Sequence, residues 1–98
     1  MNITEVRIEE IYHEEEVKAF VSIVIDGNFT VNNIRIIKSK KGRLFIAMPR
    51  RRLQTGRCRD IAYPINSDAW RTMRAQVFAA YYKYLENAYL PRKGVINA

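Results

Sequence analysis

Cysteine is almost absent from the sequence, and its scarcity excludes two kinds of small protein scaffold. Because Cys58 is the single cysteine, no intramolecular disulfide can form and no zinc site can be built from thiolates. The single histidine, His13, stands in an acidic segment without a second histidine or cysteine nearby, so no metal site is predicted. Cys58 is interpreted as a small, buried apolar residue. A redox switch is the minor alternative, because arginines flank this residue on both sides.

Long hydrophobic runs are also missing. No apolar run approaches the roughly 20 residues that span a bilayer. Residues 1–5 lack the basic start and apolar stretch of a secretory signal. A chain of 98 residues has room for one hydrophobic core and is too short for two. We therefore expect a single, soluble, cytoplasmic domain over residues 1–98, with no membrane partner.

The sequence has few of the residue patterns that catalysis needs. It contains no glycine-rich phosphate loop, no serine with a spare histidine partner, and no spaced carboxylate pair in an apolar setting. Asp26 stands in a turn, and Asp60 stands among arginines, where it is interpreted as an ion-pair partner. These absences predict that the protein is not an enzyme and that it has no cofactor and no small-molecule substrate.

Acidic residues are outnumbered, and the two signs of charge are separated along the chain. The sequence has 17 Lys and Arg against 10 Asp and Glu, which gives a net charge of +7. Five glutamates lie within residues 9–16, whereas residues 35–59 contain many bases and no acid. This separation predicts one positive side on the folded molecule, which would suit a polyanion.

Most of the chain is predicted to form antiparallel strands. Residues 17–26 are rich in β-branched side chains and carry apolar groups on both faces, so this strand is predicted to be central and covered on both sides. Asp26-Gly27-Asn28 is a strong hairpin signal, because glycine tolerates the positive φ of tight turns. The predicted strands are 3–12, 17–26, 29–38, 44–48 and 58–63.

One long helix is predicted at about residues 67–88. Asn66, Ser67 and Asp68 supply N-cap oxygens and a first-turn carboxylate. Leu90-Pro91 is expected to end the helix, which leaves residues 90–98 as a tail. A stripe of apolar positions (Ala69, Met73, Val77, Ala80 and Tyr84), flanked by large apolar and aromatic side chains, covers about half the helix circumference, more than one sheet face can bury. The sequence thus predicts an α+β fold, with an antiparallel meander of about five strands followed by one long C-terminal helix, and a homodimer.

The strongest functional signal is an arginine-rich segment that is predicted to be a loop beside a sheet edge. Clustered guanidinium groups suit phosphate, because each neutralised phosphate releases condensed counterions. The competing interpretation is a solvated loop that discourages edge-to-edge aggregation. Basic residues at 38, 40, 41 and 43 favour a continuous basic surface. The candidate nucleic-acid-binding residues in this segment are Arg50, Arg51, Arg52, Arg57 and Arg59.

A second, weaker candidate lies on the predicted helix. Arg71 and Arg74 are one turn apart near its start, where they could meet phosphates if the basic loop lies beside them. Solvated surface residues are the competing interpretation. Among the aromatic side chains, Tyr82 is the one whose position leaves base stacking open, because the spacing of the others favours core or dimer packing.

Several segments together resemble the stage V sporulation protein G (SpoVG) family over roughly residues 3–82. The matching segments are 3–8, 31–37, 44–49 and 57–67, with the helix positions Val77 and Tyr81. Three features depart from the usual family pattern. Tyr63 stands where the family commonly has histidine, Trp70 stands where the helix often has arginine, and the chain ends with Arg92 and Lys93 instead of an acidic tail.

The resemblance implies a small α+β fold, a homodimer built through sheet and helix, and a bacterial regulator of gene expression that binds DNA, with RNA binding also known in the family. In some species the family is linked to septation and sporulation. The family's basic residues after the Met-Pro step correspond to Arg50, Arg51 and Arg52. The alternative hypothesis is a protein-interaction adaptor in cell division or regulation that contacts nucleic acid only incidentally.

Overall fold

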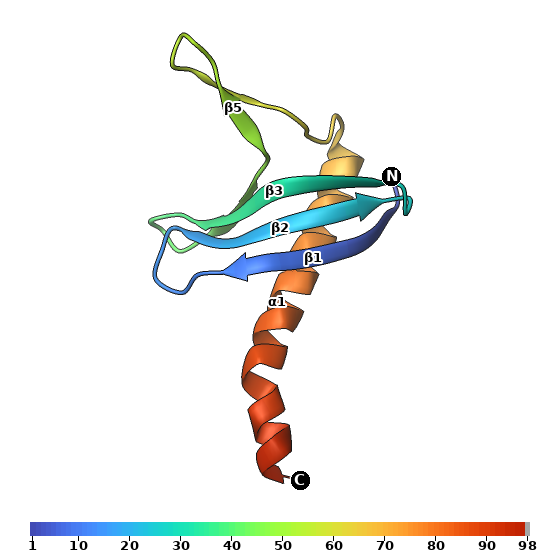
Figure 1. Ribbon diagram of the computed structural model, residues 1–98, viewed down its shortest axis with the longest axis vertical. Helices are drawn as coiled ribbons and strands as arrows, with labels where there is room; N and C mark the ends of the chain where they lie inside the picture. Colours follow the sequence, from blue (N-terminus) through green and yellow to red (C-terminus); the bar gives the residue numbers. More distant parts are fainter. Residues whose placement is uncertain (98) are drawn as a thin grey trace.

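A computed structural model describes the backbone of residues 1–97 and the side chains of residues 1–88. Figure 1 shows the long strands of a sheet crossing in front of a long helix, with a separate hairpin projecting beyond the sheet. In chain order the elements are β1 (Ile3–Ile11), β2 (Val17–Ile25), β3 (Phe29–Lys38), β4 (Leu44–Ala47), β5 (Arg50–Arg52), β6 (Cys58–Asp60) and α1 (Ser67–Asn97). The α+β fold class is therefore confirmed.

The first four strands form one antiparallel sheet in the order β1-β2-β3-β4. The turn between β2 and β3 places Asp26 at φ 53° and Gly27 at φ 67°. The Asn28 N–H donates to the Ile25 carbonyl at 2.9 Å. Two successive positive φ values are the signature of a type I′ turn, whose twist matches that of a hairpin. The predicted hairpin at this position is confirmed.

The pairing of β2 with β3 contains a bulge. Val21 pairs with Ile34 and Ile23 pairs with Val31, so two residues of β3 oppose one residue of β2. Asn33, one of the two residues opposite Ser22, has φ 63°. Asparagine enters this left-handed region more readily than most residues other than glycine, which explains why the bulge can form here.

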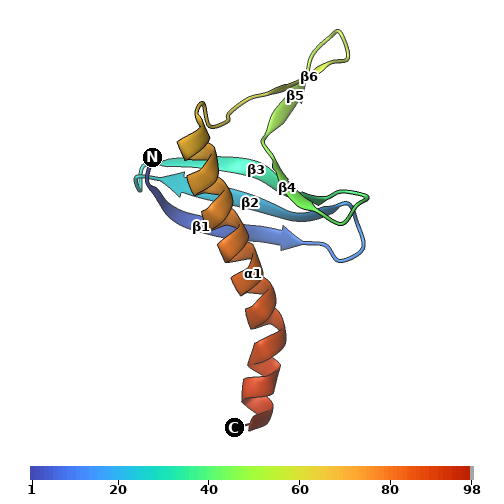
Figure 2. The ribbon, with the colours of Figure 1, turned by 180° about the vertical axis from the view of Figure 1, so that it is seen from behind.

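Helix α1 packs across one face of the four-stranded sheet (Figure 2). Its start is capped by Asn66, whose Oδ1 accepts a hydrogen bond from the Ala69 N–H at 2.8 Å. Met73 and Val77 are completely buried against the sheet. The predicted stripe is correct at these positions, but Tyr84 is 47% exposed, and Tyr81 takes the next core position along the helix. The buried core consists of Ile3, Ala19, Val21, Ile23, Ile34, Ile36, Met48, Met73, Val77 and Tyr81.

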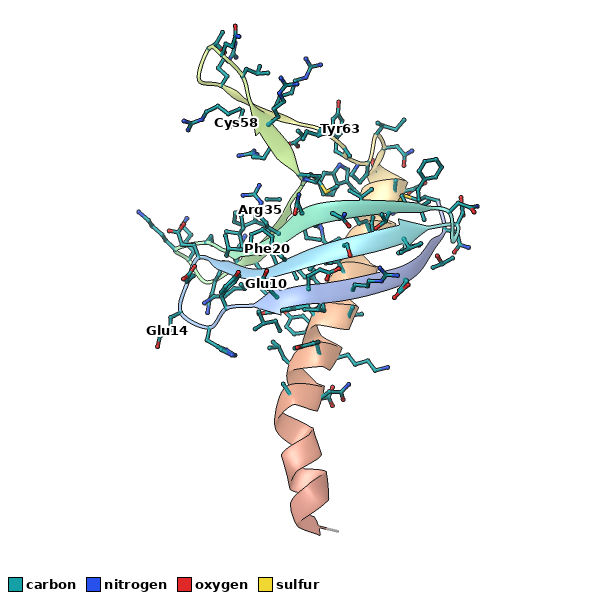
Figure 3. All side chains as sticks on the ribbon, viewed as in Figure 1. Glu10, Glu14, Phe20, Arg35, Cys58 and Tyr63 are labelled. Carbon is teal, nitrogen blue, oxygen red and sulfur yellow. The ribbon has the colours of Figure 1, made fainter. Side chains whose placement is uncertain are left out.

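The other face of the sheet is open in the described chain. β2 lies between β1 and β3, so its predicted central place is correct. Phe20, however, projects from the face opposite the helix, where Figure 3 shows it beside Glu10 and Arg35. Phe20 and Val24 are only half-buried. The expectation that this strand is covered on both faces is therefore wrong within one chain, because a single helix covers only one side of a sheet.

The strand expected at 58–63 is shorter than predicted and does not join the meander. β6 ends at Asp60 and pairs with β5, which the sequence had indicated to be loop. Pro49 follows β4 directly and cannot donate a ladder hydrogen bond, so the chain leaves the sheet there. It then folds back on itself to form a second sheet of two strands.

The predicted end of the helix near Ala88 is also wrong. The backbone stays helical through Pro91 and Gly94 to Asn97, so residues 90–97 are not an irregular tail. Proline has a φ that suits a helix, so a long helix can continue through it. The missing N–H donor makes this position cost about 3 kcal/mol. Ala98 lies outside the described residues.

Candidate nucleic-acid interface

The arginine-rich segment forms a hairpin from β5 and β6. Its register pairs Arg50 with Asp60, Arg51 with Arg59, and Arg52 with Cys58. The Leu53 N–H donates to the Arg57 carbonyl at 2.7 Å. Gly56, at φ 87°, donates its N–H to the Leu53 carbonyl at 2.9 Å and closes the turn. This second turn explains why the five arginines of the segment gather on one protruding element.

The hairpin has two faces of different chemistry, because side chains alternate along each strand. Arg51 and Leu53 share one face with Arg59 and Ile61. The Ile61 N–H donates to the Pro49 carbonyl at 2.7 Å, which continues the pairing one step beyond the assigned strands. The second face carries Arg50, Arg52, Cys58 and Asp60.

The charges on these two faces are balanced differently. Arg50 Nε lies 3.5 Å from Asp60 Oδ1, which confirms Asp60 as an ion-pair partner. Both side chains are partly exposed, so this pair adds little stability. On the other face, Arg51 and Arg59 lie directly opposite each other, and neither makes a salt bridge to any described residue. Like charges in this relation repel, and a bound anion would relieve the repulsion.

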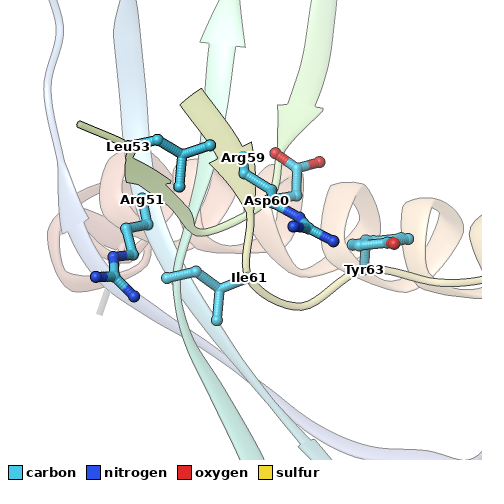
Figure 4. A pocket seen from close by; sticks show the side chains of 6 residues that line it. All are labelled: Arg51, Leu53, Arg59, Asp60, Ile61 and Tyr63. Carbon is cyan, nitrogen blue, oxygen red and sulfur yellow. The ribbon is translucent and has the colours of Figure 1, made fainter. Parts of the chain in front are cut away.

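A hollow of about 380 Å³ opens on the Arg51–Arg59 face of the hairpin. Figure 4 shows the six side chains around it, with the Arg59 guanidinium extending toward Tyr63 and Arg51 on the other side beside Ile61. Ile61 is 65% exposed and Tyr63 is 54% exposed. The hollow combines positive charge with apolar and aromatic surface, and is lined by Arg51, Leu53, Arg59, Asp60, Ile61 and Tyr63.

Arg71 and Arg74 lie on α1, on a different element from the hairpin. Arg71 is strongly exposed, and its Nη2 lies 3.5 Å from Oδ1 of Asp68, one turn earlier in the helix. Arg74 lines a separate groove of about 530 Å³, together with Trp70 and the β4 residues Leu44, Phe45 and Ile46. The structure thus brings five of the seven predicted arginines together and places these two elsewhere.

The lysines expected to extend the basic surface have acidic neighbours. Lys38 and Lys40 line a small hollow with Glu14, Glu15 and Glu16, which come from the turn between β1 and β2. The Lys38 N–H donates to the Glu16 carbonyl at 2.9 Å. Acids that are distant in sequence therefore lie beside Lys38 and Lys40 and interrupt the expected basic surface there.

Acidic side chains also mark the open face of the sheet. Glu9 accepts a hydrogen bond from the Ser22 hydroxyl at 2.7 Å. The Tyr12 hydroxyl donates to Glu10, and this bond raises the pKa of Tyr12. At Glu5, a hydrogen bond from Arg7 lowers the pKa of the carboxyl group. This face is therefore a poor surface for phosphate, in contrast to the hairpin.

Sequence reasoning missed Ile61 and Tyr63 as part of the site, because it assigned them to a strand of the meander. Gly56 was the available signal: a tight turn there makes residues 50–52 and 58–60 pair, and alternation then places Ile61 on the face of Arg51. The interpretation of Cys58 as buried is wrong, since its side chain is exposed on the protruding hairpin.

The described residues supply few other functional groups. Among them there is no cluster of His, Cys, Asp or Glu that could hold a metal ion. Within the same part of the chain, no helix combines the length and the apolar character that crossing a membrane requires.

Comparison with known proteins identifies related sequences. Residues 1–83 match the model of the SpoVG family. The chain is 44% identical to a protein from Agathobacter rectalis over 87 residues, which are 89% of this chain and 99% of that protein. It is 47% identical to a protein from Lachnospira eligens over 83 residues, 85% of this chain and 93% of that one. Both relatives carry the name "Putative septation protein SpoVG".

Proposed function

Because the chain belongs to the SpoVG family, we propose that it is a cytoplasmic, nucleic-acid-binding regulator of gene expression that uses the β5–β6 hairpin as its contact surface. DNA is the first ligand to test and RNA the second. The relatives are named as septation proteins, which supports septation as the process in which we expect such a regulator to act.

The observation that carries this proposal is the concentration of five arginines on one exposed hairpin. Arg50, Arg51 and Arg52 come from β5, and Arg57 and Arg59 come from β6 and its turn. Of these five arginines, only Arg50 has an acidic partner among the described residues. Exposed guanidinium groups can bind phosphate without first breaking an internal ion pair, and their forked geometry suits phosphate oxygens.

We further propose that the working unit is a homodimer. β4 is an edge strand whose outer side is unpaired in the described chain, and a second copy could pair with it. The groove beside β4 is lined by Leu44, Phe45, Ile46 and Trp70, which a second copy would bury. A dimer would present two hairpins to one nucleic acid, so that the second contact benefits from a high effective concentration.

The test is a salt titration of the binding of the full chain to duplex DNA and to RNA of matched length. We expect log affinity to fall with log salt at a slope near −4 or steeper, which would mean that about four or more phosphates are neutralised. Changing Arg50, Arg51 and Arg52 to alanine should weaken binding and make this slope shallower.

Lys40, Lys41 and Arg43, each changed to alanine, make the matched control. This variant also loses three positive charges, but from the turn between β3 and β4. Because the hairpin stays intact, it should bind nearly as well as the parent. Equal losses in the two variants would mean that net charge, and not the hairpin, drives binding. No binding by the parent even at low salt would overturn the proposal and favour the protein-interaction adaptor.

A further inference from the structure

The hollow on the hairpin has a lining that phosphate binding alone does not need. Two arginines would suffice for phosphate, yet Leu53, Ile61 and Tyr63 surround the same space. Ile61 and Tyr63 are both more than half exposed. Apolar and aromatic surface gathered in one exposed hollow is typical of a binding site, because a ligand with an apolar face would remove that surface from water.

The two arginines of the hollow have no acidic partner in the described part of the chain, although Asp60 is also part of its lining, because Asp60 pairs with Arg50. Arg51 and Arg59 face each other across the hairpin without an acidic partner among the described residues, whereas Arg50 on the opposite face pairs with Asp60. The unbalanced face is therefore the one that carries the aromatic ring. A ligand that satisfies both features must join an anion to a flat apolar group.

We propose that this hollow binds one unpaired nucleotide of a single-stranded nucleic acid. Its base would stack on Tyr63 and contact Ile61, while Arg51 and Arg59 hold the phosphates on either side. This inference rests on the proposed nucleic-acid function and narrows its substrate from nucleic acids in general to single strands.

The lining of the hollow suits a single strand better than a duplex. Its volume of about 380 Å³ is near the small end of the roughly 300–1,000 Å³ typical of ligand pockets. In a duplex, neighbouring base pairs cover both faces of each base, so a duplex could offer only phosphates to this site. In a single strand the base is free to stack on an aromatic ring, whatever its identity. Figure 4 shows the two arginines on different sides of the hollow, as a backbone running across it would require.

The experiment compares three probes of equal length by equilibrium binding to the full chain at one salt concentration. The probes are an unstructured pyrimidine single strand, a duplex, and a fully abasic strand that keeps the phosphates and lacks the bases. The parent should bind the single strand more tightly than the abasic strand. Tyr63→Ala should weaken binding of the single strand on the order of 5- to 100-fold and leave binding of the abasic strand and the duplex unchanged.

Two further variants separate stacking from general damage. Tyr63→Phe keeps the ring and should bind as the parent does. Tyr84→Ala removes another exposed tyrosine, 47% exposed against 54% for Tyr63. Tyr84 lies on α1 and is not in the lining of the hollow, so this variant should not discriminate among the probes.

The outcomes distinguish this proposal from the one on which it rests. If Tyr63→Ala binds the single strand like the parent, or if the parent binds the single and abasic strands equally, the nucleotide pocket is wrong. In that case, loss of binding in the variant with Arg50, Arg51 and Arg52 changed to alanine would still support the nucleic-acid function. If the parent binds none of the probes at low salt, both proposals fail, and an acidic protein segment becomes the better candidate ligand.

Discussion

At the scale of single residues, the backbone angle of Asn33 limits which residue types position 33 can tolerate. It has φ 63° inside the bulge of β3. A β-branched residue is strained there, because its Cβ approaches the following carbonyl. We predict that Asn33→Val lowers the free energy of unfolding by about 1–2 kcal/mol, and that Asn33→Gly changes it by less than about 0.5 kcal/mol. Urea unfolding measures both changes.

Asn32→Val is the matched control. Asn32 is the exposed neighbour of Asn33 and is not among the residues with positive φ. Valine is favoured in strands, so this variant should be as stable as the parent. If Asn33→Val and Asn32→Val were equally stable, the strain assigned to Asn33 would be contradicted.

The positive φ values of the β2–β3 hairpin, in its turn and at Asn33, differ in how far the sequence predicts them. Asp26-Gly27 is a local turn signal, so the turn could be predicted from neighbouring residues alone. The angle of Asn33 follows from the pairing of β3 with β2, where Ser22 has two residues opposite it. Such a mismatch between strands has no local sequence signature.

At the scale of elements, α1 is joined to the sheet through a few fully buried side chains. Met73 is completely buried among them. We predict that Met73→Ala lowers the free energy of unfolding by about 2–5 kcal/mol, because it removes apolar contacts and leaves a cavity. Gln76→Ala, at an exposed position of the same helix, should change it by less than about 0.5 kcal/mol. Urea unfolding at a fixed protein concentration checks both, and equal effects would contradict the packing described here.

The same scale shows where sequence reasoning succeeds and where it fails. The first four strands and the start of the helix were predicted to within about two residues, because alternation, the Asp26-Gly27 turn and the Asn66 cap are local signals. β5 was missed because three consecutive arginines carry no alternation. The predicted end of α1 is wrong because proline often follows the last residue of a helix, whereas here the helix continues through Pro91.

The candidate site was predicted only in part for the same reason. The arginines of residues 50–59 stand out by composition, and they do lie together on one hairpin. The hollow beside them depends on the register of that hairpin, which places Ile61 next to Arg51 and brings in Tyr63. The acids beside Lys38 come from a turn about 20 residues earlier in the chain, so no local pattern indicates them.

At the scale of the whole molecule, the groove beside β4 bears on the proposed homodimer. Phe45 is 46% exposed there. We predict a mass in solution of twice 11.5 kDa by sedimentation equilibrium. Phe45→Glu should weaken dimerisation at least about tenfold, since a second copy would have to bury the new charge.

Phe29→Glu is the control for this change. Phe29 is 74% exposed at the far end of β3, away from the residues that pair with β4. This variant should remain dimeric. A parent that sediments at 11.5 kDa would contradict the dimer, and equal weakening by the two variants would contradict the assignment of this groove as its interface.

The exposed thiol of Cys58 is a single site at which the protein can be labelled chemically. It lies on the hairpin face opposite the hollow, across from Arg52, and no other cysteine competes with it. A spin label or fluorophore attached there would leave the Arg51–Arg59 face uncovered. In a dimer, the distance between two such labels would measure the distance between the two hairpins. That distance would set the length of nucleic acid that both hairpins could contact at once.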